Sequence, residues 1–458
     1  MRMKLTVIGG GGGRSMFLAK SIAQRAGSLG IGELVFMDIN AEKLRLFGGM
    51  AERVAHMLAP QMAFSLTTDP VEAVSGADYV ITTLRVGGDR MRSRDEHTAL
   101  DLGVLGQETT GAAGFSFAMR SIPVLAEYCA LVKKHARPGA RVFNFTNPVG
   151  IVSQALRDLG YGFTYGICDA PSGMLGQFAR LYGRASGDIR GDLFGLNHLS
   201  WFHKVMLDGK DIMPELLRNP EARQTTDLKF FDQALLTFLG HIPNEYLYYY
   251  YHPERVLHNI LKAGKTRGDS ILEINEGMRA EMAGLDPKKD FDRCLRVFTK
   301  WYGIREAQYM ASETGVRRGV PPWTFDAFEP DEGGYAGVAL SFIDIEQSGR
   351  KDSMILTVPN AGAVDFLEDT DTVEVTCDIS PKGCVPRKFP RVPDDQAELI
   401  RRVKYFERLG ARAIIHRDRQ MAVKALMLHP LVNSFSLAQQ LADAYIGLNA
   451  AFTGAWNG

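Results

Sequence analysis

A run of five glycines between an apolar segment and a helical segment constrains the fold of this 458-residue chain more than any other feature. Residues 4–8 have the pattern of a short buried strand, and residues 16–26 have the apolar periodicity of a helix. The glycines occupy positions 9–13 and are followed by Arg14 and Ser15. A strand that enters a helix through such a turn is typical of the first unit of a dinucleotide-binding α/β sheet.

Strand and helix patterns alternate along the first 170 residues. Strands are predicted at residues 4–8, 33–37, 77–83, 141–145 and 163–167, and helices at residues 16–26 and 41–57. This alternation predicts right-handed crossovers and a Rossmann-like, doubly wound parallel sheet. Polar segments at 9–15, 144–148 and 168–171 each follow a strand. We therefore expect them to meet at the carboxyl edge of the sheet, where ligands of such sheets bind.

The pattern changes at about residue 190. A hairpin is predicted at 192–207, mainly helices at 225–320, strand-like segments at 335–377 and long helices at 394–454. A chain of this length exceeds one typical core. We predict a Rossmann-like NAD-binding domain over residues 1–190 and a mixed α+β catalytic and oligomerisation domain over residues 191–458.

Composition excludes several classes of protein. The chain has 53 Lys and Arg against 53 Asp and Glu, so its formal net charge is zero, which argues against a nucleic-acid partner. We expect no signal peptide, because the first strand begins near Met1, and no membrane span, because no apolar run approaches about 20 residues. The five scattered cysteines favour free thiols in a reducing cytoplasm.

The glycine-rich turn is a candidate dinucleotide site. Glycines let the backbone approach a pyrophosphate, whose negative charge the helix N-terminus favours. No frame gives the full GxGxxG pattern, and Gly10, Gly12 and Ser15 give the nearest match. Asp38 ends the next strand, where a carboxylate binds the ribose hydroxyls and favours NAD over NADP. The predicted cofactor-binding residues are Gly10, Gly11, Gly12, Gly13, Arg14, Ser15 and Asp38. The alternatives are a turn without a ligand, and an Arg14 that holds a phosphate or another anion.

Cys168 and His198 are candidate metal ligands, since both lie in glycine-punctuated segments and both bind divalent transition metals well. Each also has a structural interpretation. A cysteine after a strand is often a small core residue, and a lone histidine is often a satisfied core residue. For the neighbours Asp169 and Asn197, the structural alternatives are a helix N-cap and a turn amide.

Two further segments carry polar groups. Tyr246 begins a tyrosine-rich run that is normally core or interface, and a tyrosine acts as a base only when a cation lowers its pKa from about 10. Residues 85–111 form a polar, glycine-rich passage that includes Arg85 and Arg92. Such a loop would overlie the cofactor and contact a sugar or an anion; the alternative is a solvated surface loop with internal ion pairs.

In order and spacing, these segments resemble glycoside hydrolase family 4, the NAD- and metal-dependent glycosidases whose fold is similar to that of lactate and malate dehydrogenases. The matching passages are residues 7–15, 85–110, 144–148, 166–171, 195–198, 243–247, 358–363 and 425–432. Each motif is modest, but the ordered set spans nearly the whole chain and is specific.

The resemblance implies roles for particular residues. Cys168 and His198 would ligate a divalent ion, typically Mn²⁺, and Asn147 would contact both cofactor and sugar, holding the sugar near the nicotinamide. Tyr246 would be the base, and Asp169 the acid for the leaving group. The implied substrate contacts are Arg92, Asn147, Asp169 and Asn197. The implied reaction is hydrolysis of a glycoside by transient oxidation at carbon 3, elimination of the aglycone and addition of water, an exception to the usual pair of carboxylates.

Departures from the family pattern bear on the substrate. Phosphosugar members typically have Ser and Thr where this chain has Gly13 and Arg14, and many phospho-β members have Arg-Gly-Gly where it has Glu332, Gly333 and Gly334. Hydroxyl and guanidinium groups bind phosphate. We therefore expect an anionic group at carbon 6 that is either a phosphate or another anion, as in a sulfoquinovoside or a uronic acid. Aspartate at position 169 resembles the phospho-α-glucosidases and favours an α-linkage.

Two rival functions remain. An NAD-dependent 2-hydroxyacid dehydrogenase shares the expected fold but has no use for a Cys–His metal pair and would accumulate NADH. A non-catalytic NAD-responsive binding protein would also leave that pair unexplained. The resemblance further suggests a homodimer or homotetramer that acts on a small sugar glycoside.

Overall fold

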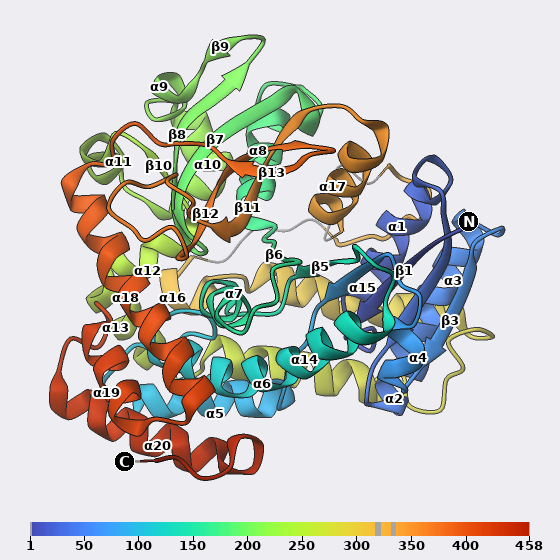
Figure 1. Ribbon diagram of the computed structural model, residues 1–458, viewed down its shortest axis with the longest axis horizontal. Helices are drawn as coiled ribbons and strands as arrows, with labels where there is room; N and C mark the ends of the chain where they lie inside the picture. The colour runs from blue at the N-terminus through green and yellow to red at the C-terminus, as the bar shows by residue number, and fades with distance from the viewer. Residues whose placement is uncertain (1, 317–321, 331–335, 458) are drawn as a thin grey trace.

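The computed structural model describes residues 2–316, 322–330 and 336–457 (Figure 1). In this part of the chain the main sheet has nine strands. Their order is β13 (Gly383–Pro386), β12 (Thr372–Ser380), β11 (Asp352–Pro359), β6 (Thr164–Gly166), β5 (Arg141–Asn144), β4 (Tyr79–Thr82), β1 (Met3–Ile8), β2 (Ile31–Met37) and β3 (Ala63–Thr67).

Strands β1 to β6 are parallel, and their spatial order 3-2-1-4-5-6 is that of a dinucleotide-binding sheet. The predicted parallel α/β fold is thus confirmed, and the polar segments at 9–15, 144–148 and 168–171 follow β1, β5 and β6. β3 was not among the predicted strands. It lies at the edge of the sheet with several half-exposed side chains, so its apolar signal is weak.

Helices cover the sheet and form much of the second half (Figure 1). Those of the first half are α1 (Ser15–Leu29), α2 (Ala41–Lys43), α3 (Gly49–Leu58), α4 (Pro70–Val74), α5 (Gly88–Leu100), α6 (Gly111–His135), α7 (Val149–Asp158) and α8 (Ala170–Leu181). Those of the second half are α9 (Met213–Leu216), α10 (Pro220–Thr225), α11 (Gln233–Leu239), α12 (Tyr248–Tyr251), α13 (Pro253–Ala263), α14 (Arg267–Glu281), α15 (Phe291–Ala307), α16 (Ala311–Thr314), α17 (Gly337–Ser348), α18 (Asp394–His416), α19 (Arg419–Leu428) and α20 (Phe435–Thr453).

Two predictions of local structure were wrong. The strand-like interpretation of residues 335–377 fails at α17, because a short apolar run has the same composition in a buried helix as in a strand. The passage after β4, expected as an irregular loop, is largely the helix α5, whose many charged side chains hide its amphipathic pattern.

The long helix α6 corrects the expectation about apolar runs. By length and composition alone it is able to cross a membrane. In the structure, however, 61% of its apolar window is buried, and its Arg120 pairs with Asp95 of α5 inside the protein. These contacts are those of a core helix, which has the same composition as a span.

A second sheet holds the predicted hairpin. β7 (Ile189–Leu196) and β8 (Leu199–Leu207) pair antiparallel, with β9 (Lys210–Asp211) and β10 (Ile242–Pro243) against β8. Asn197 and His198 form the turn between β7 and β8. Strands β11–β13 come from the second half of the chain but extend the sheet of the first half. The division at residue 190 stays a prediction.

Candidate active site

The glycine-rich turn lies between β1 and α1 and is packed against two neighbouring strands. Gly9 has φ +103°, and a Cβ there would lie 2.4 Å from the carbonyl oxygen of Thr83. A Cβ at Gly10 would lie 2.6 Å from Cβ of Phe36. Gly13, by contrast, has no atom within 4 Å of such a Cβ. The first glycines therefore let the turn approach the sheet, and the later ones leave open space beside the N-terminus of α1.

Asp38 lies at the end of β2 and faces this turn. Its Oδ2 accepts a hydrogen bond from the Gly11 backbone nitrogen at 3.1 Å, and its Oδ1 accepts one from Asn40 at 2.9 Å. A Cβ at Gly11 would lie 2.8 Å from Asp38 Oδ2. Ser15 is buried and donates to the Gly10 carbonyl at 2.6 Å, so it closes the turn from within. This strand–glycine–helix–carboxylate arrangement fits a dinucleotide.

A cavity of about 830 Å³ opens at this carboxyl edge of the sheet. Most of the predicted site residues line it: Gly11, Gly12, Gly13, Arg14, Ser15, Asp38, Arg92, Asn147, Cys168, Asp169, His198 and Tyr246. Gly10 lies behind the lining, against Phe36, and Asn197 is also outside it. The volume suits a dinucleotide with a small substrate beside it.

Cys168 and His198 come together in this cavity from different sheets. Cys168 follows β6 and His198 is in the β7–β8 turn, yet Sγ and Nε2 are 3.7 Å apart. Among the described residues, no group of three or more Cys, His, Asp and Glu side chains is arranged to hold a metal ion. Cys168 and His198 are thus two soft groups that both line the cavity, and a divalent cation held by them would be open to it.

Burial sets the protonation of this pair. It lowers the pKa of His198 to about 3, so the imidazole is neutral at pH 7. Burial, followed by the negative charges of Glu374 and Asp169, raises the pKa of the Cys168 thiol well above its ordinary value. These negative charges disfavour a bare thiolate at this position.

Thr109 determines which nitrogen of His198 carries the hydrogen. The Thr109 hydroxyl donates to Gln107 Oε1 at 3.0 Å and lies 3.0 Å from His198 Nδ1. Because its own hydrogen is used on Gln107, Thr109 accepts a hydrogen bond from Nδ1–H. The lone pair of Nε2 is then directed toward Cys168, which is the tautomer that a metal ligand needs.

Tyr246 lies against the same imidazole. Its ring is stacked on that of His198, with centroids 3.7 Å apart and planes within 4°. Burial, and next the charge of Glu245, raise the pKa of Tyr246 far above the ordinary value of a phenol. The Tyr309 hydroxyl, which also donates to Glu245 Oε1 at 3.3 Å, hydrogen-bonds Tyr246 and acts in the opposite direction. A cation beside His198 would favour the phenolate.

Asn147 and Asp169 present polar groups to the cavity. Within the described residues Asn147 Oδ1 is a buried acceptor with no donor, as expected of a group that awaits a ligand. Asp169 occupies the N-cap position of α8, but in the described structure its carboxylate caps no backbone nitrogen. Asp169 is thus at the N-cap, as the structural alternative expected, but without the side-chain hydrogen bond of a cap, and it lines the cavity.

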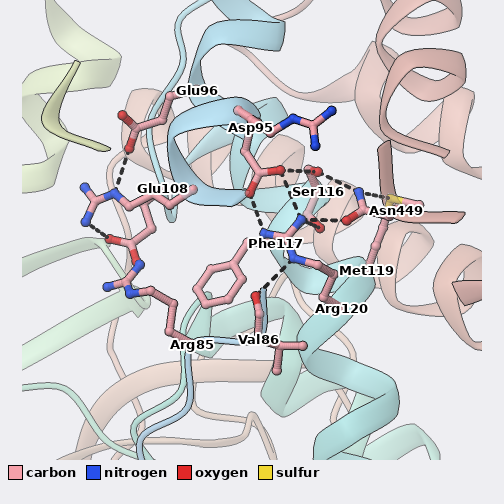
Figure 2. A network of polar contacts seen from close by, with 12 residues as sticks. Arg85, Val86, Asp95, Glu96, Glu108, Ser116, Phe117, Met119, Arg120 and Asn449 are labelled. Atoms are coloured by element: carbon pink, nitrogen blue, oxygen red, sulfur yellow. Dashed lines mark hydrogen bonds and ion pairs between the residues drawn. The ribbon is translucent and has the colours of Figure 1, made fainter. Parts of the chain in front are cut away.

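Arg92 is buried in an ion-pair network rather than free to bind an anion. It contacts Glu96 Oε1 at 2.9 Å and Glu108 Oε2 at 2.8 Å. Figure 2 shows Glu108 also facing Arg85, with which it pairs. The internal ion pairs that were the alternative for this passage are thus present, although the passage is not a solvated loop.

Figure 2 shows a second cluster beside this network. Arg120 pairs with Asp95 at 2.5 Å and donates to Asn449 at 2.6 Å, which connects α5, α6 and α20. Its Nε donates to the carbonyl of Val86 at 3.1 Å. This buried network fixes the loop that carries Arg85 into the cavity.

Asn197 faces away from the cavity. Its Nδ2 donates to Glu374 Oε1 at 2.9 Å, in keeping with the turn-amide alternative. This geometry gives no support to the expected contact between Asn197 and a substrate, which stays without evidence.

Sequence reasoning missed Arg267, Arg305 and Tyr309, which also line the cavity. Arg267 begins α14, and its Nη1 is buried with no acceptor among the described groups. Burial and the nearby charges of Arg305 and Arg92 lower the pKa of Arg267 to about 10. No local motif marks these positions; only the folding of α14 and α15 against the cavity brings them there.

Family models account for both halves of the chain. Residues 4–183 match the model "Family 4 glycosyl hydrolase", and residues 193–432 match "Family 4 glycosyl hydrolase C-terminal domain". The 6-phospho-beta-glucosidase of Escherichia coli is 30% identical, with 97% of this chain and 95% of the relative covered. Maltose-6'-phosphate glucosidase MalH of Clostridium acetobutylicum is 27% identical, with 98% of each covered.

Solved structures agree over the same extent. The 6-phospho-beta-glucosidase of Thermotoga maritima, solved with NAD and glucose-6-phosphate, superimposes with a TM-score of 0.82 at 25% identity over 99% of both chains. A 6-phospho-alpha-glucosidase from gut microorganisms, solved with NAD and Mn²⁺, gives a TM-score of 0.80 at 25% identity over 100% of both. The paired family models, joined by these full-length similarities, show that the chain belongs to glycosyl hydrolase family 4.

Proposed function

We propose that this protein is an NAD⁺- and divalent-metal-dependent glycosidase whose substrate carries an anionic group on carbon 6 of the sugar. The observation that carries the proposal is the convergence on one cavity of a glycine-rich dinucleotide turn, a Cys–His pair and a tyrosine stacked on that histidine. A dehydrogenase would need the first of these features and not the others.

The residues present fit both cofactors. The turn at residues 9–15 and Asp38 would hold NAD⁺, and Cys168 with His198 would hold a divalent cation. Support comes from the relatives solved with NAD and Mn²⁺. When bound, NAD⁺ supplies reversible oxidation of the sugar at carbon 3, and the cation supplies Lewis acidity beside it.

The chain's own groups would then carry the proton transfers. Tyr246 would take the proton from carbon 2 after oxidation has made it acidic, and Asn147 would orient the sugar through its buried Oδ1. Asp169 would give a proton to the leaving oxygen, since this residue lines the cavity. The base and the acid lie on different elements, as proton transfer at two separate atoms requires.

Cationic side chains around the cavity support an anionic substrate. Arg14, Arg267 and Arg305 line it, and burial, followed by the charges of Arg305 and Arg92, lowers the pKa of Arg267 to about 10. Bringing an anion into this cluster relieves the mutual repulsion of the guanidinium groups. Arg267 is the best placed, because its buried Nη1 has no acceptor among the described groups.

The anion itself is a phosphate, a sulfonate or a uronic carboxylate. Relatives named for 6-phosphosugars favour phosphate, whereas Gly13 and Arg14 replace the hydroxyl residues of phosphosugar members and favour a different anion, as in a sulfoquinovoside. The second departure, at Glu332–334, lies outside the described residues. Asp169 favours an α-linkage, and a homodimer or homotetramer in the cytoplasm remains our expectation.

A panel of nitrophenyl glycosides tests this function. The 6-phosphoglucoside, the sulfoquinovoside and the unmodified glucoside are each assayed with and without NAD⁺, Mn²⁺ and a reductant. We expect cleavage of an anionic substrate only when both cofactors are present, without net formation of NADH. Turnover of the unmodified glucoside alone would rule out the proposed anionic substrate. Stoichiometric formation of NADH would indicate a dehydrogenase.

Replacement of Asp169 by asparagine tests the acid. A poor leaving group needs a proton, whereas a nitrophenolate does not, so D169N should slow alkyl glycosides by about 10²–10⁴-fold and activated aryl glycosides far less. The measurement is kcat/KM across a series of aglycones of increasing pKa. Equal slowing of all members would rule out the acid role.

Replacement of Thr109 tests the tautomer of His198. T109V removes the hydroxyl that bonds Nδ1, so Mn²⁺ affinity should fall by about 10–100-fold, while T109S retains the hydroxyl and should stay near wild type. Mn²⁺ binding is followed by electron paramagnetic resonance. Equal affinities for T109V and T109S would show that the hydroxyl has no such role.

A further inference from the structure

Glu374 is a buried carboxylate on β12 that neither lines the cavity nor belongs to any motif discussed above. Its exposed fraction is 1%. Oε1 accepts a hydrogen bond from Asn197 Nδ2 and Oε2 accepts one from the Ser200 hydroxyl, both at 2.9 Å. These donors lie on either side of His198, so one carboxylate holds both ends of the turn that carries the candidate metal ligand.

This turn has a conformation that needs support. His198 has φ +62°, a left-handed backbone that is uncommon for a residue with a side chain. Such conformations persist where the surrounding structure determines them, and they cluster at functional sites. The hydrogen bonds from Asn197 and Ser200 to Glu374, which lies outside the hairpin, hold the turn in this conformation.

The strand that carries Glu374 also connects to Cys168. In the main sheet, Glu374 pairs with Thr357 of β11, and Thr357 pairs with Gly166 of β6, two residues before Cys168. Cys168 and His198 belong to segments of different sheets. The ladder from β6 through β11 to β12, continued by the side chain of Glu374, is therefore a rigid connection between the two ligands.

We propose that Glu374 is a positioning residue for the metal pair, which fixes His198 Nε2 opposite Cys168 Sγ by anchoring the Asn197–Ser200 turn to the main sheet. The role rests on the proposed function, since it presumes that the pair binds a divalent cation. Glu374 acts through geometry: it touches the turn and not the ligands. Outer-sphere partners of this kind typically change metal affinity by about 10–100-fold when they are lost.

Three variants separate positioning from charge. E374A removes both acceptors, and E374D keeps the charge but is one methylene too short to reach both donors. E374Q loses the charge but keeps an acceptor for Asn197 and an amide that donates to the Ser200 oxygen. Titration with Mn²⁺, followed by electron paramagnetic resonance, should show affinity about 10–100-fold weaker for E374A and E374D and within a few-fold of wild type for E374Q.

Thr376 provides a matched control. It lies on the same face of β12 two residues further, is buried, and its hydroxyl bonds Leu193 and Gly191 of the same hairpin, far from the turn. T376V should leave the Mn²⁺ affinity unchanged, and NAD⁺ affinity, measured by fluorescence titration, should be unchanged in every variant. A failure of E374A to fold leaves E374D and E374Q to decide.

The outcomes are distinct. Equal Mn²⁺ affinity for E374D and wild type, or loss of affinity in E374Q to the level of E374D, would overturn the positioning role. Loss of affinity in T376V as large as in E374D would also overturn it, because any weakening of the hairpin would then suffice. Wild-type protein that binds no Mn²⁺ would overturn both this inference and the proposed function, whereas Mn²⁺ binding unaffected by Glu374 would overturn the inference alone.

Discussion

Replacement of Tyr246 by phenylalanine is expected to reduce kcat by about 10²–10⁴-fold, the range for loss of a general acid or base. The phenol is buried and stacked on His198, and its pKa is far too high for a base unless a cation lies beside that imidazole. The change removes one oxygen and keeps the stacking. Exchange of the carbon 2 hydrogen with solvent deuterium should disappear together with turnover.

Tyr248 is the control for this variant. It belongs to the same tyrosine run and is buried, but it does not line the cavity. Y248F should retain turnover and exchange, and both variants should bind Mn²⁺ and NAD⁺ as the wild type does. Undiminished exchange at carbon 2 in Y246F would assign the base to another group.

Replacement of Cys168 by alanine is expected to reduce turnover by as much as Y246F does. It removes one of two protein ligands, so Mn²⁺ binding should be lost, and with it the several kcal/mol that Lewis-acid catalysis contributes. At 1.36 kcal/mol per tenfold, activity should fall by about 10³-fold or more. The measurements are Mn²⁺ titration and turnover at saturating NAD⁺, and wild-type protein treated with a chelator should behave in the same way.

Cys384 is the control for the thiol. It is half-buried on β13 and lies outside the cavity lining. C384A should keep both Mn²⁺ binding and turnover. Retention of Mn²⁺ by C168A at wild-type affinity would show that the thiol is no ligand.

The confirmed predictions rest on patterns within a few residues. The strand at 4–8 runs directly into the glycines, Asp38 directly follows the next strand, and the parallel pairing of these two strands is confirmed. The edge strand β3 and the helix α17 were misjudged, because a half-exposed strand and a short apolar run have weak or ambiguous periodicity.

The polar face of β12 illustrates what no pattern reveals. Thr372, Glu374 and Thr376 alternate with apolar residues, which is typical of a strand with one solvated face. All three are buried, because α7, α18 and the β7–β8 hairpin cover that face. The sequence specifies the alternation, but which elements cover the polar side depends on contacts between distant segments.

By itself, the sequence determined the α/β class, the site of dinucleotide binding that we propose and most of the chemical groups of the cavity. Only the tertiary structure decided that Cys168 and His198 lie 3.7 Å apart, that Arg92 is neutralised by Glu96 and Glu108, and that Asn197 faces Glu374. The physical reason is that backbone propensities act over a few residues, whereas side-chain pairing follows from the packing of whole sheets and helices.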